Sequence, residues 1–284
     1  MNPRMHALKP GGEFDRIPRL EGHGYSQSLE RGLAILACFS PEHHVLGIAD
    51  LADMLGMSRP TTHRYVTTLV ALGYLEQCPS RKYRLGLRVT DLGMSALNCT
   101  GLREHAHTLL EDLRFNSSFT VSLALLDGTE ILYVDRARSF RRGQHKIDLN
   151  LRLGSRLPAY CTAMGKVLLA YLPEAEQVKI VAQMELVKRG PNTITTKKAL
   201  LAELEHVREE GMAVNDEELT HGLISIAVPV RNESREVFAA INMAAHTDMI
   251  SLAELVDQLL PHLHTTGDHI SARLGYRRDD ERVS

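Results

Sequence analysis

The sequence has 284 residues, more than a typical single domain, and therefore predicts two domains. Apolar residues make up 44% and charged residues 24%, which excludes the disordered and fibrous classes, and no apolar run resembles a membrane span or a signal peptide, so we expect a cytoplasmic protein without a membrane partner. The net charge of −2 indicates no nucleic-acid partner for the whole chain, but residues 1–90 hold 11 Lys or Arg against 8 Asp or Glu.

The chain begins with a segment that has no helical or alternating apolar period. Residues 1–25 contain three prolines and four glycines, a composition typical of a mobile tail. From Ser26 onward the pattern becomes helical, and Ser26 itself suits the N-cap position. The apolar residues that recur at helical spacing are Leu29, Leu33, Leu36 and Phe39. The sequence therefore predicts a first helix that is stopped by Pro41.

Two further helices and a hairpin follow. Residues 48–55 predict a short helix that ends at Gly56, where a left-handed conformation is needed. Ser58 caps a third helix, and Pro60 lies in its first turn, where a missing N–H costs nothing. Short alternating stretches on both sides of "CPSR" predict a hairpin. Together these elements indicate a winged helix-turn-helix module over residues 26–90.

The third helix has an outward face suited to DNA. Its apolar side carries Val66 and Leu69, which leaves Arg64 on the opposite side. A helix fits the major groove, where arginine pairs with guanine and threonine contacts a thymine methyl group, while basic residues of the hairpin contact phosphates. A solvated helix is the alternative, but the order of cap, glycine turn and basic hairpin favours double-stranded DNA. The residues expected to contact DNA are Ser58, Arg59, Thr61, Thr62, His63, Arg64, Thr68, Arg81, Lys82 and Arg84.

The remaining chain alternates hairpins with helices. Strands are predicted on both sides of Asp127-Gly128 and of residues 232–234, with helices between the two hairpins. A final helix is predicted to break or kink near Pro261. This pattern indicates an α+β domain. We assign a linker helix, a second domain and a C-terminal tail to residues 91–104, 105–276 and 277–284.

Side chains suited to catalysis or metal binding occur in patterns that favour structural roles. The four cysteines form no CxxC pair, and His262 and His264 have no Cys or carboxylate at ligand spacing. Acidic runs are usually solvated, and no nucleotide-binding loop is present, so we expect no enzyme, metal or cofactor. A basic loop is assigned to solvent, with contact to DNA or an anionic ligand as the alternative; it carries Arg136, Arg138, Arg141, Arg142 and Lys146.

Several segments resemble a known family. They are "SLERGLAILACF" and "IADLADMLGMSRPTTHRYVTTLVALGYLEQ" in the first domain, and "RLGSRLPAYCTAMGKVLLAYLP" and "NDEELTHGLISIAVPV" in the second. Through these segments the chain resembles the IclR family of bacterial transcriptional regulators over residues 26–275. "LGSRLPAYCTAMGKVLLA" is similar to members that govern catabolism of protocatechuate and 4-hydroxybenzoate.

The resemblance implies an α+β fold in which the winged helix-turn-helix is joined by a linker helix to a GAF-like antiparallel-sheet effector domain. It also implies a homodimer or a dimer of dimers on a palindromic operator, controlled by a small organic acid. The pocket positions implied by the resemblance are Ala163, Met164, Asn215, Ser225, Asn242 and Ala244. Arg152 and Arg156 are further candidates, because paired arginines suit a carboxylate.

The implied pocket departs from that of relatives that bind small acids. Ser225 and Ala244 stand where those relatives carry a cysteine and a serine, and Asn215 stands where an acidic residue occurs. Fewer polar groups favour a larger, partly apolar effector such as an aromatic acid. The alternatives are a regulator of another carboxylic-acid pathway and a GAF-like sensor whose winged helix contacts protein.

Overall fold

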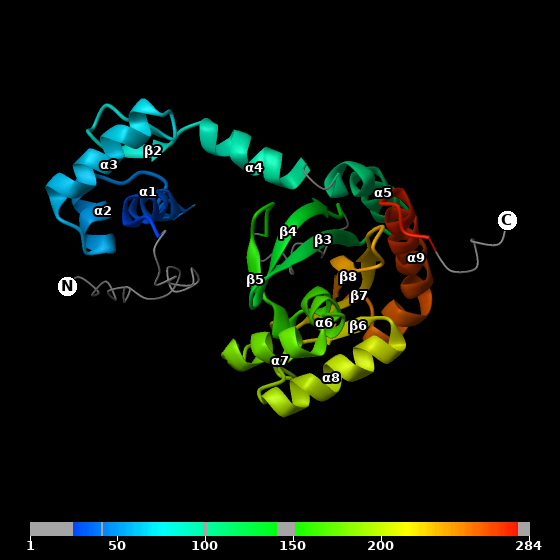
Figure 1. Cartoon of the computed structure of the whole chain (residues 1–284). Helices are drawn as coiled ribbons and strands as arrows, with labels where there is room; N and C mark the ends of the chain where they lie inside the picture. The colour runs from blue at the N-terminus through cyan, green and yellow to red at the C-terminus, as the bar shows by residue number, and fades with distance from the viewer. Residues whose placement is uncertain (1–24, 41, 99–100, 141–150, 278–284) are drawn as a thin grey trace. The chain divides into compact units, whose positions relative to one another are not determined.

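The computed structural model describes residues 25–40, 42–98, 101–140 and 151–277 (Figure 1). The chain divides into two compact units between Ala96 and Leu97, inside the segment predicted to be the linker. Predictions that lie outside the described residues concern the terminal tails at 1–24 and 278–284 and the residues Pro41, Cys99, Thr100, Arg141, Arg142 and Lys146.

The N-terminal unit packs helices against a small antiparallel sheet. Its elements are α1 (Gln27–Ala37), α2 (Ile48–Leu55), α3 (Arg59–Ala71), β1 (Leu75–Gln77) and β2 (Tyr83–Leu85). Gly56 closes α2 at a φ of 61°, a left-handed conformation that L side chains rarely adopt. The core is formed by Ile35, Leu51, Val66 and Leu75 from four of these elements. The predicted winged helix-turn-helix is confirmed.

Helix α1 turns part of its apolar stripe away from this core. Ser26 caps the helix as predicted, because its hydroxyl accepts the Leu29 N–H at 3.3 Å. Leu29 and Leu33 are nevertheless 63% and 51% exposed, whereas Ile35 is fully buried. An apolar stripe normally marks a buried face. Among the described residues of the N-terminal unit, none therefore covers this apolar part of α1.

Helices α4 (Arg88–Asn98) and α5 (Leu102–Ser117) follow the winged module and differ in burial. None of the side chains of α4 from Arg88 to Ala96 is buried. Helix α5 instead buries Leu102, Ala106, Leu110 and Leu113 in the core of the second unit. The predicted linker helix at 91–104 thus contains the end of an exposed helix and the start of a packed one.

The second unit is built on a six-stranded antiparallel sheet with the order β5-β4-β3-β8-β7-β6. Its strands are β3 (Thr120–Asp127), β4 (Glu130–Ala137), β5 (Arg156–Pro158), β6 (Ala213–Asp216), β7 (Leu223–Arg231) and β8 (Val237–His246). Both predicted hairpins are confirmed, with Gly128 at a φ of 61° in the first turn. The edge strands β5 and β6 were not predicted; they have three and four residues and pair with β4 and β7, which lie far from them in the sequence or across other elements.

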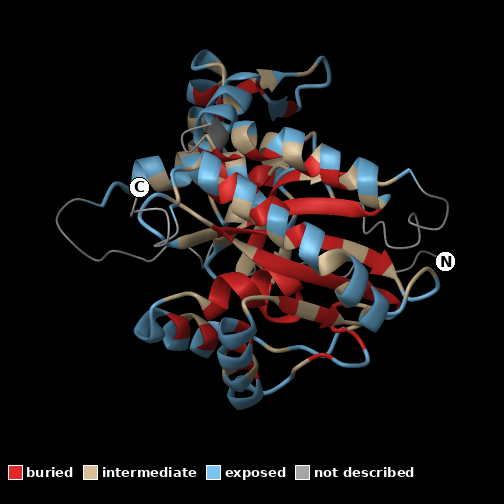
Figure 2. Cartoon of the chain, turned by 90° about the vertical axis from the view of Figure 1, so that its right-hand side faces the viewer, coloured by how far each residue is buried: buried red, intermediate tan, exposed pale blue. Residues whose placement is uncertain are grey.

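Helices cover both faces of the sheet (Figures 1 and 2). Helices α5 and α9 (Leu252–Arg273) lie on one face, and α6 (Ala163–Ala170) lies on the other, supported by α7 (Glu174–Gln183) and α8 (Lys197–Glu210). Along β3, Val121 and Leu123 join the core beneath α5 and α9, whereas Ala124 joins the core beneath α6. Two-sided burial commits each strand residue to one of two cores.

Helix α6 lies close to its neighbours along its whole length, and every one of its side chains is buried. A Cβ atom at Gly165 would lie 2.2 Å from the Ala159 carbonyl oxygen, so only glycine permits this approach. The predicted helix is confirmed, and its N-cap is Thr162, whose hydroxyl accepts the Gly165 N–H at 3.2 Å.

Lys166 of α6 is 1% exposed and is held by two carboxylates. Its Nζ lies 2.7 Å from Glu203 Oε1 on α8 and 2.6 Å from Glu218 Oε1 in the segment after β6. Burial raises the pKa of Glu218, and the Lys166 ammonium opposes that effect. The buried charge therefore fixes α6 against both neighbours, because an unpaired charge there is costly.

Helix α9 begins with a capping box and runs through Pro261 without a break. Ser251 accepts the Glu254 N–H, and Glu254 accepts the Ser251 N–H at 3.0 Å. Of the predicted break or kink at Pro261, the break is wrong, because the packing of both halves of α9 against the sheet outweighs one lost backbone hydrogen bond, and the kink stays a prediction. In the described part of the chain, no helix is long and apolar enough to cross a membrane.

The contacts of Lys166 with the two carboxylates predict that its substitution lowers the stability of the fold by an amount that depends on pH. Replacing Lys166 by Met leaves Glu218 buried without its counter-charge and lowers the free energy of unfolding by about 3–5 kcal/mol at neutral pH. Without the ammonium, the pKa of Glu218 rises further above that of the unfolded chain, so protonation stabilises the folded variant. The loss in free energy of unfolding is therefore largest at pH values above this raised pKa, and it shrinks as the pH falls through that pKa.

Urea unfolding of the two proteins from about pH 8 to about pH 5 measures this dependence. Lys179→Met on the exposed side of α7 is the matched control and is expected to change little. A loss in free energy of unfolding that stays constant across this pH range would show that Glu218 does not cause it.

Candidate functional site

The first candidate surface is the exposed face of α3. Ser58 caps the helix by accepting the Thr61 N–H at 3.4 Å, and Pro60 lies in the first turn, both as predicted. Val66 and Leu69 are buried, while Arg64 and Thr68 are exposed on the other side. The local pattern therefore presents one long cationic side chain with threonines beside it.

The other α3 residues predicted to contact DNA differ in how exposed their side chains are. Arg59 and His63 are exposed, and Thr61 is half-buried and bonded to the Ser58 hydroxyl at 2.8 Å. Thr62 is fully buried, and its hydroxyl donates to the Ser58 carbonyl at 3.1 Å. The prediction that Thr62 contacts DNA is therefore wrong, because its side chain belongs to the core of the unit.

The β1–β2 hairpin carries the predicted basic cluster. Arg81, Lys82 and Arg84 are all exposed. Arg84 pairs across the hairpin with Glu76 at 2.9 Å, so this arginine is partly neutralised by its own sheet. Arg81 and Lys82 remain the cations at the turn, which is where a wing would approach phosphates.

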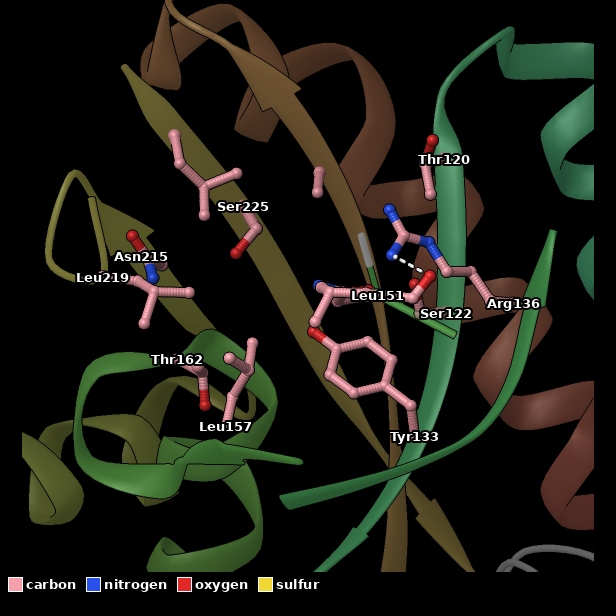
Figure 3. A pocket seen from close by; sticks show the side chains of 13 residues that line it. Thr120, Ser122, Tyr133, Arg136, Leu151, Leu157, Thr162, Asn215, Leu219 and Ser225 are labelled. Carbon is pink, nitrogen blue, oxygen red and sulfur yellow. Dashed lines mark hydrogen bonds between the residues drawn. The ribbon is translucent and has the colours of Figure 1, made fainter. Parts of the chain in front are cut away.

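The second candidate site is a pocket on the α6 side of the sheet (Figure 3). Its volume is about 30 Å³. The lining combines one guanidinium with hydroxyl, amide and aliphatic side chains: Thr120, Ser122, Tyr133, Arg136, Leu151, Leu157, Thr162, Asn215, Leu219, Leu223, Ser225, Asn242 and Ala244. The pocket therefore offers one cation within a largely neutral wall.

The eight predicted effector-binding residues divide into two groups. Four of them line the pocket together: Asn215, Ser225, Asn242 and Ala244. Ala163 and Met164 are 1% exposed inside α6 and are absent from the lining, although Thr162 just before them belongs to it. The residue at this helix start that reaches the pocket is therefore the N-cap Thr162, directly before the two predicted positions.

The two arginines that were candidates for carboxylate contacts lie outside the pocket lining. Arg156 pairs with Asp127 at 2.5 Å and lies 3.9 Å from Glu130, so nearby carboxylates already neutralise it. Arg152 is exposed. The structure does not bring these arginines together in the pocket with the other predicted residues, so a paired carboxylate contact from them stays an untested prediction.

Arg136 is the charged pocket residue that the sequence analysis missed. It was assigned to a solvated basic loop, but it lies on β4 opposite Ser122, and its guanidinium donates to the Leu151 carbonyl at 3.2 Å (Figure 3). The register of β4 against β3 shifts between Leu123 and Ala124, which leaves Val134 as a bulge. Strict alternation from Tyr133 would have turned Arg136 away from the pocket, so only the bulge places it there.

Two polar groups of the pocket are fixed by their surroundings. Asn215 donates to the Cys161 carbonyl at 2.7 Å and accepts the Glu218 N–H at 3.1 Å, which sets the orientation of its amide. Burial raises the pKa of Tyr133 to about 12, so its phenol stays neutral at physiological pH. Both side chains therefore act as neutral hydrogen-bonding groups.

The same surroundings give no sign of nucleophilic or metal chemistry. Burial raises the pKa of Cys161 to about 11, which keeps it a thiol at neutral pH. Within the described ranges, no group of three or more His, Cys, Asp or Glu side chains is arranged to hold a metal ion. The pocket is suited to binding a small anion.

Comparison with known proteins covers both units. Residues 28–79 match the IclR helix-turn-helix domain, and residues 94–272 match the bacterial transcriptional regulator IclR C-terminal domain. The chain is 34% identical to the HTH-type transcriptional regulator XynR of Escherichia coli over 88% of this chain and 98% of the relative. It is also 34% identical to the Pca regulon regulatory protein of Pseudomonas putida, over 84% and 81%.

Solved structures show the same fold. A putative transcriptional regulator from Rhodococcus sp. RHA1 superposes with a TM-score of 0.76 at 36% identity and covers 88% of this chain and 98% of its own. The IclR protein of Thermotoga maritima superposes with a TM-score of 0.69 at 28% identity, over 88% and 99%. The matched families and relatives are regulators and not enzymes. With its winged reading module and its effector-domain pocket, the chain belongs to the IclR family of bacterial transcriptional regulators.

Proposed function

We propose that the chain regulates transcription in response to an aromatic carboxylic acid bound in the Arg136 pocket. The observation that carries this proposal is the guanidinium of Arg136 on a wall that also holds Leu157, Leu219 and Leu223. Arginine matches a carboxylate with two parallel hydrogen bonds. The leucines suit the ring, and Tyr133 offers a hydrogen bond to a ring hydroxyl.

The small size of the pocket supports a regulatory role. A volume of about 30 Å³ is too small for a benzene ring, so an aromatic acid enters only if lining side chains move apart. Such a ligand binds the opened arrangement better than the closed one. A difference of this kind is what allows a ligand to change the population of a conformation.

Relatives support the aromatic class. The chain is 34% identical to the p-hydroxybenzoate hydroxylase transcriptional activator of Acinetobacter baylyi over 87% of this chain and 91% of the relative. An inducer-binding domain of PobR from Acinetobacter, solved as a double mutant with 3-hydroxybenzoic acid, is 34% identical with a TM-score of 0.54 and covers 60% of this chain. Identity alone does not select an effector, since XynR is equally similar.

We further propose that the protein acts as a homodimer or a dimer of dimers on a palindromic operator. One α3 helix offers few base-reading side chains, and a second copy doubles them. The exposed Leu29 and Leu33 on α1 supply an apolar surface for a second copy, and Leu92 and Met94 are exposed apolar side chains on α4. Ser58, Arg59, Thr61, His63, Arg64 and Thr68 would face the operator, with Arg81, Lys82 and Arg84 at its edge.

Arg64→Ala tests whether the exposed face of α3 contacts the bases of the operator. Loss of a paired contact to a guanine should lower affinity for an operator obtained by binding-site selection by about 5- to 150-fold and relax its sequence preference. Gel-shift titration measures both effects. Lys198→Ala, an equal change of charge on exposed α8, is the control. Unchanged affinity and preference in folded Arg64→Ala protein would reject the assignment.

Arg136→Met tests the carboxylate anchor. Removing a charge-assisted contact should weaken binding of 4-hydroxybenzoate by roughly 10- to 100-fold in calorimetry. Arg156→Met, which removes an arginine outside the pocket, should bind normally. Tight binding of aliphatic acids alone would reject the aromatic class, and a loss caused by Arg156→Met but not by Arg136→Met would reject the anchor.

The double variant Leu29→Glu with Leu33→Glu tests the dimer surface. Burying two carboxylates at a subunit contact is costly, so the variant should sediment as a smaller species and lose most of its operator affinity. Val178→Glu on exposed α7 is the control. An assembly state equal to that of the unsubstituted protein would place the subunit contact elsewhere.

A further inference from the structure

Asp135 ties strand β4 to helix α5 on the face of the sheet opposite the pocket. Its side chain is only 4% exposed. Its Oδ2 lies 2.9 Å from His107 Nδ1 and 3.8 Å from Arg103 Nε, and both of these residues belong to the first half of α5. A carboxylate only accepts hydrogen bonds, so His107 donates from Nδ1. The strand and the helix therefore share a buried charge.

The same carboxylate also holds the backbone of the pocket arginine. Asp135 Oδ1 accepts the Arg136 N–H at 2.8 Å, while the Arg136 guanidinium lies in the pocket on the other face. The bulge at Val134 creates this arrangement, because Asp135 pairs with Leu123 of the α5 side and Arg136 pairs with Ser122 of the pocket side. Two adjacent residues, Asp135 and Arg136, thus connect helix α5 on one face of the sheet to the pocket on the other.

We infer that Asp135 is a positioning residue through which occupancy of the pocket changes the placement of α5, with His107 as its partner on the helix. The inference rests on the proposed function, in which Arg136 holds the effector carboxylate. A ligand that moves the guanidinium also moves the Arg136 backbone, and Asp135 passes that shift to His107. Helix α5 begins at Leu102, within the predicted linker at 91–104 and a few residues after the boundary between the two units.

The physical reason is the cost of separating this contact. A buried carboxylate that loses its partners is strongly destabilised, so helix and strand move together in preference to moving apart. The other ion pair described on α5 differs in this respect. Arg114 and Glu111 pair at 2.8 Å within the helix itself and connect it to no strand. Glu111 is therefore a matched control for His107.

His107→Ala provides the direct test in the full-length protein. The His107 side chain is 51% exposed and lies outside the pocket, so the variant should bind 4-hydroxybenzoate within about threefold of the unsubstituted protein. In the unsubstituted protein this ligand should change operator affinity by roughly 5- to 150-fold. That change should fall below about twofold in His107→Ala and stay complete in Glu111→Ala.

A purely structural role for His107 gives a different result. It would lower the melting temperature of His107→Ala and leave the ligand-induced change in operator affinity at its full size, which would overturn the inference. Asp135→Asn is the second variant, since its amide oxygen still accepts the Arg136 N–H but it carries no charge for Arg103. Asp135→Asn should also bind the ligand, but the ligand should change its operator affinity only weakly. A ligand-induced change of full size would overturn the inference.

A ligand-free double-mutant cycle separates this inference from the proposed effector. Operator affinity is measured for Arg136→Met, for His107→Ala and for both changes together. Independent substitutions have effects that multiply within about twofold. We expect a larger deviation, and simple multiplication would overturn the coupling. If no aromatic acid binds the unsubstituted protein, the effector proposal fails, while this cycle still decides whether Asp135 couples the two faces.

Discussion

The central constraint on the effector domain is a sheet that is buried on both faces. Alternation commits each strand residue either to the α6 side, where the pocket lies, or to the α5 and α9 side. The bulge at Val134 is the local exception that exchanges the faces of the next two residues. Because of that one residue, Arg136 enters the pocket and Asp135 meets His107.

Both faces contain buried charges, and each is matched by a partner on another element. Lys166 joins α6 to Glu203 and Glu218, while Asp135 joins β4 to α5. Pairs of this kind add little net stability, but breaking one is costly, so they define which arrangement of elements is allowed.

The structure of the DNA-binding unit depends mainly on local features of the sequence. Its caps, its glycine turn and its short hairpin are local features, and the exposed side of α3 results directly from burying Val66 and Leu69. The uncovered leucines of α1 show that one copy of this unit does not satisfy all of its apolar surface. The two units therefore differ in what they present: exposed apolar side chains on α1 in one, and a small pocket with one arginine in the other.

The sequence by itself determined the caps Ser26 and Ser58, both long hairpins, the winged module and the family, because those signals lie within short stretches of the chain. Only the tertiary structure decided that Thr62 is buried, that Arg156 is neutralised by Asp127, and that α9 continues through Pro261. The same holds for Arg136, whose place in the pocket depends on a bulge defined by the register with β3. Register arises between distant segments, and a pattern of neighbouring residues does not contain it.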